Sequence, residues 1–203
     1  MRCLIVYILS LLSLTVNGQS VPQKMQIKWG VCATFNISAP GDLTTINPEA
    51  EVQLGYGGGI GGELRMFWPS NWLIVSSAIL NSDNLKINQI RDCKIDLTRL
   101  SVSVRETAGH SFNIRDNLKI APLVGIEFSY ILSNSADNEF SKKDFMWSPV
   151  NVSWGFGAEF ILGNITVATM GYYGLINILR RSSLCYSKSL YDNKACVSVK
   201  YYF

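Results

Sequence analysis

The only histidine of this 203-residue sequence stands beside a serine, in the segment Gly109-His110-Ser111. A serine activated by a histidine and an acid is the constellation of an esterase, so the pair raises the hypothesis of an enzyme that acts on lipid. Adjacent Ser and His residues in a turn do not form a triad, however. We therefore interpret His110 as a solvated turn residue, and the chain is not expected to be an enzyme.

Neither a metal nor a phosphate site is predicted. One histidine without a Cys-x-x-Cys spacing is a poor metal-ligand set. The glycine run GYGGGIGG, residues 55–62, alternates within an extended segment rather than opening a helix, as a phosphate cradle does. No cofactor is expected. A net charge of +3 without a cluster of Lys or Arg also argues against nucleic acid as a partner.

Apolar residues dominate the amino terminus. Met1-Arg2 is followed by a fourteen-residue apolar run and then by Asn17-Gly18, which predicts a secretory signal peptide over residues 1–18 and one domain over 19–203. No later stretch has eighteen successive apolar residues, so no transmembrane helix is predicted. If the chain spans a membrane, it does so as a closed barrel, because lipid does not tolerate open sheet edges.

The last eleven residues alternate strictly and end on an aromatic residue. Val197, Val199, Tyr201 and Phe203 share one face, which is the period of a strand between two different environments. This ending resembles the terminal strand of bacterial outer-membrane barrels, which the assembly machinery recognises. The resemblance implies that Val199, Tyr201 and Phe203 act as an assembly signal.

Seven earlier segments show the same two-faced alternation, which predicts an all-β, eight-stranded antiparallel up-and-down transmembrane β-barrel. A change of parity near Thr98-Arg99 suggests a bulge there. Long connections alternate with shorter ones such as 69–71 and 163–164, the asymmetry of a barrel with long outer loops and both termini in the periplasm. The expected segments are 24–36, 52–68, 72–80, 94–106, 118–132, 150–162 and 165–178.

The two faces of these strands differ in size as well as polarity. Eight strands leave a lumen that side chains just fill, so large aromatic residues are expected outside, and glycine with paired charges inside. The lumen should therefore not conduct freely. The predicted outward aromatics are Trp29, Phe35, Tyr56, Phe128, Trp154, Phe156 and Phe160, and the predicted lumen charge network is Lys28, Glu63, Arg65, Glu127, Glu159 and Lys200.

Four cysteines remain beyond the signal peptide. The first and last strands of a closed barrel are neighbours, so Cys32 and Cys196, which both point inward, could form a disulfide if the register allows it. Cys93 and Cys185 would then lie near the outer loops and could bond together. A local bond between Cys185 and Cys196 is the competing pairing, and both schemes stay open.

With its strands placed, the chain resembles the small outer-membrane β-barrel domain family common in Bacteroidetes, which includes porin-like and PorT-like members. The resemblance implies a bacterial outer-membrane location, with lipid and the barrel-assembly machinery as partners. Arg99 departs from the family, which often has Pro there. The segments that carry the resemblance are KWGVCATFNIS, GYGGGIGGELRMFWPSNW, APLVGIEFSYIL, VSWGFGAEF, GYYGLINI and VSVKYYF.

These patterns specify a barrel rather than an activity. We expect a structural, adhesive or assembly role, with a protein partner bound through the outer loops, because loops on a rigid scaffold concentrate function. An outer-membrane lipid-modifying enzyme and a secreted, soluble lipocalin-like binding barrel are the alternatives.

Overall fold

The computed structural model describes residues 25–41, 51–88, 94–136, 145–177, 179–182 and 191–203. Eight long antiparallel strands form a closed barrel, as the alternation predicts. Within the described residues, no helix is long and apolar enough to cross a membrane. The barrel strands are β1 (Gln26–Gly41), β3 (Gly55–Phe67), β4 (Trp72–Asn88), β5 (Lys94–His110), β7 (Leu118–Ala136), β9 (Val150–Leu162), β10 (Ile165–Gly174) and β12 (Tyr191–Tyr202).

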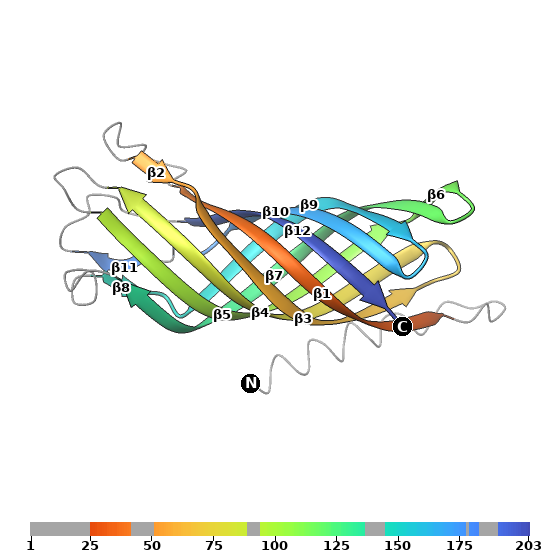
Figure 1. The fold of residues 1–203 in the computed structure, drawn as a ribbon, viewed down its shortest axis with the longest axis horizontal. Coiled ribbons are helices and arrows are strands. Elements are labelled where there is room, and N and C mark those ends of the chain that lie inside the picture. The colour runs from red at the N-terminus through yellow and green to blue at the C-terminus, as the bar shows by residue number, and fades with distance from the viewer. Residues whose placement is uncertain (1–24, 42–50, 89–93, 137–144, 178, 183–190) are drawn as a thin grey trace.

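Each strand pairs with its neighbours in the chain, and β12 pairs with β1 to close the barrel (Figure 1). The start of β1 and the carboxy-terminal residue Phe203 lie at the same end as the turns 68–71 and 163–164, which we call the turn end. The opposite end is the loop end. Residues 107–117 lie between two of the expected segments. In the structure they complete β5 and form the short strand β6 (Phe112–Arg115), which pairs with the start of β7 at the turn end.

Three further short strands lie at the loop end. β2 (Glu51–Gln53) pairs with the far part of β4. β8 (Phe145–Trp147) and β11 (Leu179–Ser182) pair only with each other and form a separate two-stranded sheet among the described residues (Figure 1). The loop end therefore carries structure beyond the barrel wall.

Two tight turns follow from residues that tolerate a left-handed backbone. Gly163 has φ of 59° at the first position of the two-residue loop between β9 and β10, where type II′ hairpins place glycine. Asn71 has φ of 63° between β3 and β4, and its N–H donates to the Trp68 carbonyl oxygen at 3.0 Å. Both turns lie where the sequence predicts them.

The sequence predicts a bulge near Thr98-Arg99 of β5, but the structure places the bulge on the neighbouring strand β7. β5 pairs with β4 without interruption from Lys94 to His110. Against β7, the register shifts between Leu100 and Ser101, which face Ser133 and Ile131, so the extra residue is Leu132 of β7. Since β5 itself has no bulge, Arg99 keeps the inward parity of Ser101 and Ser103.

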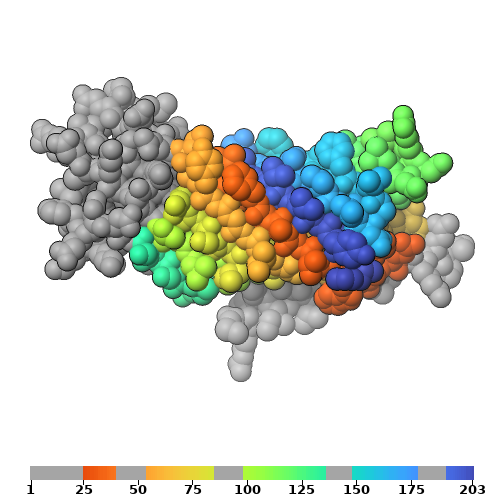
Figure 2. Space-filling view, in the orientation of Figure 1, coloured from red at the N-terminus to blue at the C-terminus, as the bar shows by residue number. Residues whose placement is uncertain are grey.

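Alternation places large apolar side chains on the outside and polar ones inside. Trp29 is 68% exposed and Phe203 is 75% exposed, whereas Arg65 is 1% exposed. All seven aromatics predicted to face outward are at least 40% exposed. Figure 2 shows side chains of β1, β3 and β12 packed in oblique rows over this outer wall.

Gly157 of β9 faces the lumen where the backbone of β10 comes close. A Cβ at Gly157 would overlap the Thr169 carbonyl oxygen and lie 2.6 Å from Sδ of Met170, whereas a Cβ at Gly171 would meet only the Phe156 carbonyl oxygen at 3.9 Å. We expect Gly157→Ala to lower the free energy of unfolding by about 1–3 kcal/mol through overpacking.

Urea titration of barrels folded in lipid vesicles, read by the gel mobility of unheated samples, measures this effect. The control Gly171→Ala should shift the free energy by roughly 0.5 kcal/mol or less. Equal effects of the two substitutions would contradict the close approach at Gly157.

Candidate functional site in the barrel lumen

Ionisable side chains of both signs are buried in the lumen. In the part of the chain that the structure describes, five acids and five bases are buried there, so their formal charges cancel. Buried charges are tolerated when they are paired and hydrogen-bonded. The acids are Glu63, Asp83, Glu127, Glu159 and Asp192, and the bases are Arg65, Arg99, Arg105, Lys194 and Lys200.

Glu159 of β9 joins two cations from other strands. Arg65 of β3 donates to Glu159 Oε2 at 2.6 Å, and Lys200 of β12 donates to Glu159 Oε1 at 2.6 Å. Lys200 also lies 3.1 Å from Glu63, which accepts further hydrogen bonds from Ser77 at 2.8 Å and from the Tyr202 hydroxyl at 2.5 Å. We call these the Glu159 cluster: Glu63, Arg65, Glu159, Lys200 and Tyr202.

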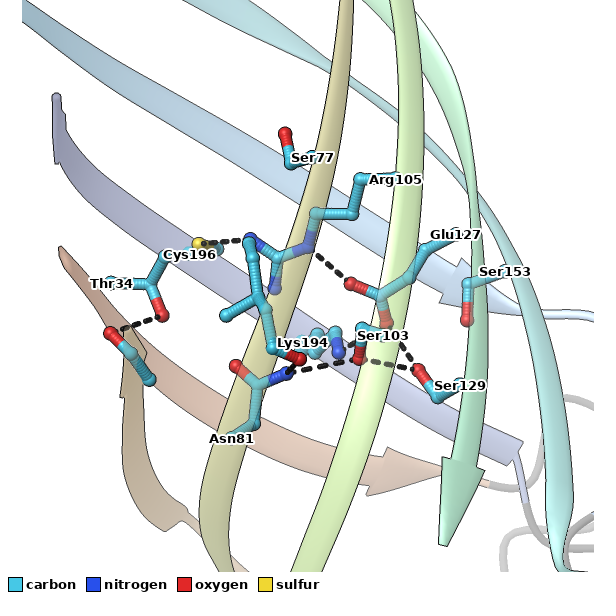
Figure 3. Close-up of polar contacts among 12 residues, drawn as sticks. Thr34, Ser77, Asn81, Ser103, Arg105, Glu127, Ser129, Ser153, Lys194 and Cys196 are labelled. Atoms are coloured by element: carbon cyan, nitrogen blue, oxygen red, sulfur yellow. Dashed lines mark hydrogen bonds and ion pairs between the residues drawn. The ribbon is translucent and has the colours of Figure 1, made fainter. Parts of the chain in front are cut away.

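A second cluster is centred on Glu127 of β7 (Figure 3). Arg105 of β5 donates to Glu127 through Nε at 2.5 Å, and Lys194 of β12 pairs with the other carboxylate oxygen. Ser129 donates to Glu127 at 2.9 Å. The contacts continue through Ser103 to Asn81 of β4, each at 2.9 Å, so this layer reaches around a large part of the wall.

Each cluster contains a tyrosine ring placed between a glycine and a cation. The ring of Tyr202 lies against Gly30 of β1, and the Arg65 guanidinium is 3.9 Å from the ring centroid. The ring of Tyr172 lies against Gly155 of β9, with the Arg105 guanidinium 5.2 Å from its centroid. Glycine leaves room for a ring that covers the neighbouring strand, and the ring face attracts the cation.

The lumen nearer the loop end is polar. Arg99 donates to Asp192 at 2.6 Å, and the amide nitrogen of Asn36 donates to Asp83 at 3.0 Å. The side-chain oxygen of Asn36 and one oxygen of Asp192 are buried without a hydrogen-bond partner among the described residues. Such groups need water or another donor.

An apolar cluster lies in the lumen beside the Glu159 cluster. Leu73 and Val75 of β4 are fully buried, and they belong to a cluster that continues across the lumen to β7, β9, β10 and β12. Phe67 packs against this cluster. The apolar cluster consists of Leu73, Val75, Ala121, Leu123, Ile161, Met170, Tyr172 and Cys196.

The structure brings five of the six predicted network residues into the two ionic clusters. Lys28 is the exception, because it is half-buried near the start of β1 and takes part in no ion pair among the described residues. Sequence reasoning missed five buried charges: Asp83, Arg99, Arg105, Asp192 and Lys194. Parity was the available signal for the last two, since both share the face of Cys196 and Lys200.

The predicted disulfide between Cys32 and Cys196 does not form, and both side chains are buried free thiols. The register explains this difference. Cys32 lies opposite Lys200, and Cys196 lies opposite Asn36, so the two cysteines are offset along the seam. Arg105 donates to the sulfur of Cys196 at 3.3 Å. Cys93 and Cys185 lie outside the described residues, as does the predicted signal peptide.

His110 is not the solvated turn residue that the sequence suggests, because it ends β5 and its Nδ1 is buried. The His110 ring packs against Trp72 and Phe112, with ring centroids 5.4 Å and 4.8 Å away. The Ser111 hydroxyl donates to the Asn71 carbonyl oxygen at 3.2 Å. Across the described residues, no group of three or more His, Cys, Asp or Glu side chains is arranged to hold a metal ion.

The proposed assembly-signal residues lie on the outer face of the closing strand. Val199 is 54% exposed and Tyr201 is 45% exposed. The backbone N–H of Phe203 donates to the Trp29 carbonyl oxygen at 2.9 Å, which continues the seam past the end of β12. These three residues therefore face the surroundings of the barrel rather than its lumen.

The central role of Glu159 is testable by neutralising it. Glu159→Gln leaves Arg65 and Lys200 without their shared carboxylate in the lumen, so we expect the free energy of unfolding to fall by about 3–5 kcal/mol. Urea titration in lipid vesicles measures this loss. Lys28→Gln serves as the control and should change the value by roughly 0.5 kcal/mol or less. Comparable losses in both variants would contradict the network.

The two seam cysteines should stay reduced and protected. In a chain that begins at Gln19 and carries Cys93→Ser and Cys185→Ser, we expect a maleimide of high mass to label neither Cys32 nor Cys196 while the barrel is folded. Both should react after unfolding without prior reduction. A non-reducing peptide map that links Cys32 to Cys196 would contradict the register of the seam.

Several solved structures of outer-membrane proteins are similar to this chain at low identity. The outer membrane enzyme PagL shares 14% identity with a TM-score of 0.49, over 84% of this chain and 98% of that chain. OprG from Pseudomonas aeruginosa shares 10% identity with a TM-score of 0.47, over 88% of this chain and 95% of that one. Ail of Yersinia pestis, in complex with the heparin analogue sucrose octasulfate, shares 12% identity with a TM-score of 0.44, over 88% and 99%.

At these identities the likeness concerns the fold alone. No curated protein matches the chain at a significant level. A family model described as the outer membrane protein beta-barrel domain matches residues 9–203, and together with the fold it supports an outer-membrane location. The chain therefore belongs to the outer membrane protein beta-barrel domain family.

Proposed function

We propose that this protein is a non-conducting outer-membrane barrel that acts through its loop end in a structural, adhesive or assembly role. The observation that carries this proposal is the filled lumen. Ion pairs join opposite walls, as between Arg65 of β3 and Glu159 of β9. Beside them lies the apolar cluster. An eight-stranded lumen filled in this way leaves no continuous path for water.

The loop end offers the surface for a partner. Among the described residues, the separate β8–β11 sheet extends beyond the wall at that end, whereas tight turns connect β3 to β4 and β9 to β10 at the other. This asymmetry supports an orientation with both termini in the periplasm and the longer connections outside. A protein partner bound through these loops fits the role, and nucleic acid is not part of it.

Two further partners belong to the proposal. Outer-membrane lipid covers the exposed apolar wall, and the barrel-assembly machinery recognises Val199, Tyr201 and Phe203 of the closing strand. The porin-like and PorT-like relationship within Bacteroidetes is part of the same proposal, on the motifs quoted above. The predicted signal peptide would deliver the chain to the periplasm.

The alternative functions find less support. A lipid-modifying enzyme needs an activated nucleophile, yet the Ser111 hydroxyl donates to a backbone carbonyl and the His110 ring packs between aromatic rings. A soluble lipocalin-like barrel needs a polar exterior, whereas Trp29 and Ile60 of this chain are 68% and 69% exposed on the outer wall.

Planar-bilayer recording tests the absence of a pore. We expect the purified barrel, shown to be folded by a change of gel mobility on boiling, to insert into the bilayer without producing stepwise conductance. The reason is that the ionic clusters and the apolar cluster fill its lumen. A general porin in the same bilayer is the positive control. Reproducible conductance steps from the wild-type chain would contradict the proposal.

A further inference from the structure

The side chain of Glu106 places a carboxyl group on the outer wall of the barrel. Glu106 of β5 is directly opposite Ser76 of β4, and the Ser76 hydroxyl donates to Glu106 Oε2 at 2.7 Å. Both side chains are half-buried and have the outward parity of Val102 and Val104, which are 37% and 43% exposed. This pair is separate from the lumen clusters, which lie on the opposite face of the same strands.

The pair sits inside the apolar band of the wall. Ser76 is halfway along β4 between Trp72 and Leu80, which are 55% and 46% exposed. Trp72 contacts His110 in an aromatic group near the turn end, whereas the outward residues Ser82 and Asn84 beyond Leu80 are polar and exposed. A carboxyl group between these limits faces hydrocarbon, where it is unfavourable unless a partner satisfies it.

The wall around this pair includes small side chains, although Leu64 and Ile126 lie directly opposite Ser76 and Glu106 on the flanking strands. Gly62 of β3 lies opposite Ala78 of β4, and a Cβ at Gly62 would meet no atom within 4 Å. Ala108 follows Glu106 on the outer face of β5. We call this surface the Glu106 patch: Gly62, Ser76, Ala78, Glu106 and Ala108. Small side chains let a second barrel wall approach closely.

The wall over β9 and β10 differs in character. Trp154 and Tyr173 stack there with ring centroids 5.4 Å apart, and Phe156 lies 6.0 Å from Tyr173. Their exposed fractions are between 40% and 50%. This aromatic wall suits lipid chains, so the barrel has one aromatic side and one aliphatic side with a polar centre.

We propose that the Glu106 patch is the interface between two copies of this chain in the membrane. A neutral carboxyl group and a hydroxyl group each donate and accept a hydrogen bond, so the pair is complementary to a second copy of itself. A two-fold axis through the patch would place Ser76 and Glu106 of one copy against the same residues of the other. This inference rests on membrane insertion and is independent of the role at the loop end.

A second copy fits the patch better than lipid does. The hydrogen-bond donors of a lipid are in its headgroup, at the edge of the apolar band. Ser76 lies midway between the limits of this band, where headgroups do not reach. Acyl chains offer no hydrogen bond to the carboxyl group. The second copy supplies polar groups at the required depth, because its own patch lies at the same level of the membrane.

Energy transfer between donor-labelled and acceptor-labelled copies in vesicles of phosphatidylcholine and phosphatidylglycerol tests the proposal. We expect wild-type barrels to associate. Ala78→Phe, which adds a ring beside the polar pair, and Glu106→Leu, which removes the polar centre, should each weaken association about tenfold or more. Ala158→Phe, at a small outward position on β9, is the matched control and should leave association unchanged.

Gel mobility before and after boiling shows that each variant is folded, so loss of association is separable from loss of the barrel. Two results would overturn the proposal. One is a wild-type barrel that stays monomeric at every protein-to-lipid ratio, including in native lipid extract. The other is association that survives Ala78→Phe or that falls equally with Ala158→Phe. Conductance plays no part in this readout, so its outcome is independent of the test for a pore.

Discussion

Charges buried inside a narrow barrel have to find their partners on other strands, and this requirement shapes the whole interior. Arg65 of β3 reaches Glu159 of β9, and Lys194 of β12 reaches Glu127 of β7, although neither pair of strands is adjacent. Five acids balance five bases within the described lumen. Ion pairs of this kind fix the distance between opposite walls, and the tyrosine rings over Gly30 and Gly155 fill the space between them.

Period-2 alternation is a local property, so the architecture could be predicted from the sequence. The same pattern separated outward aromatics such as Trp154 from inward charges such as Glu63, because successive side chains of a strand point to opposite faces. The turn at Gly163 could be predicted because its residue types favour one backbone geometry. Five of six network residues were accessible in this way, since side-chain direction follows from parity alone.

Strand register and the spatial neighbours of a side chain depend on distant parts of the chain. The remaining differences between the prediction and the structure arise from these two properties. The distance between Cys32 and Cys196 depends on the register between β1 and β12, and neither strand determines this register by itself. Arg99 lies beside the expected bulge, which belongs to β7, so its inward direction did not follow from local parity. Lys28 has inward parity, yet it lies at the end of the barrel, where no acid is near enough to pair with it among the described residues.

The terminal strand has a role in the timing of assembly that its outward face does not reveal. β12 contributes Asp192, Lys194 and Lys200, whose partners lie on β3, β5, β7 and β9. Until this strand docks, Glu63 and Arg99 lack their ion-pair partners, Glu127 and Glu159 each lack one of two cations, and one sheet edge stays open, which lipid does not tolerate. Barrel closure and charge neutralisation are therefore a single cooperative event, so a chain truncated before β12 would be left without a stable membrane-inserted intermediate.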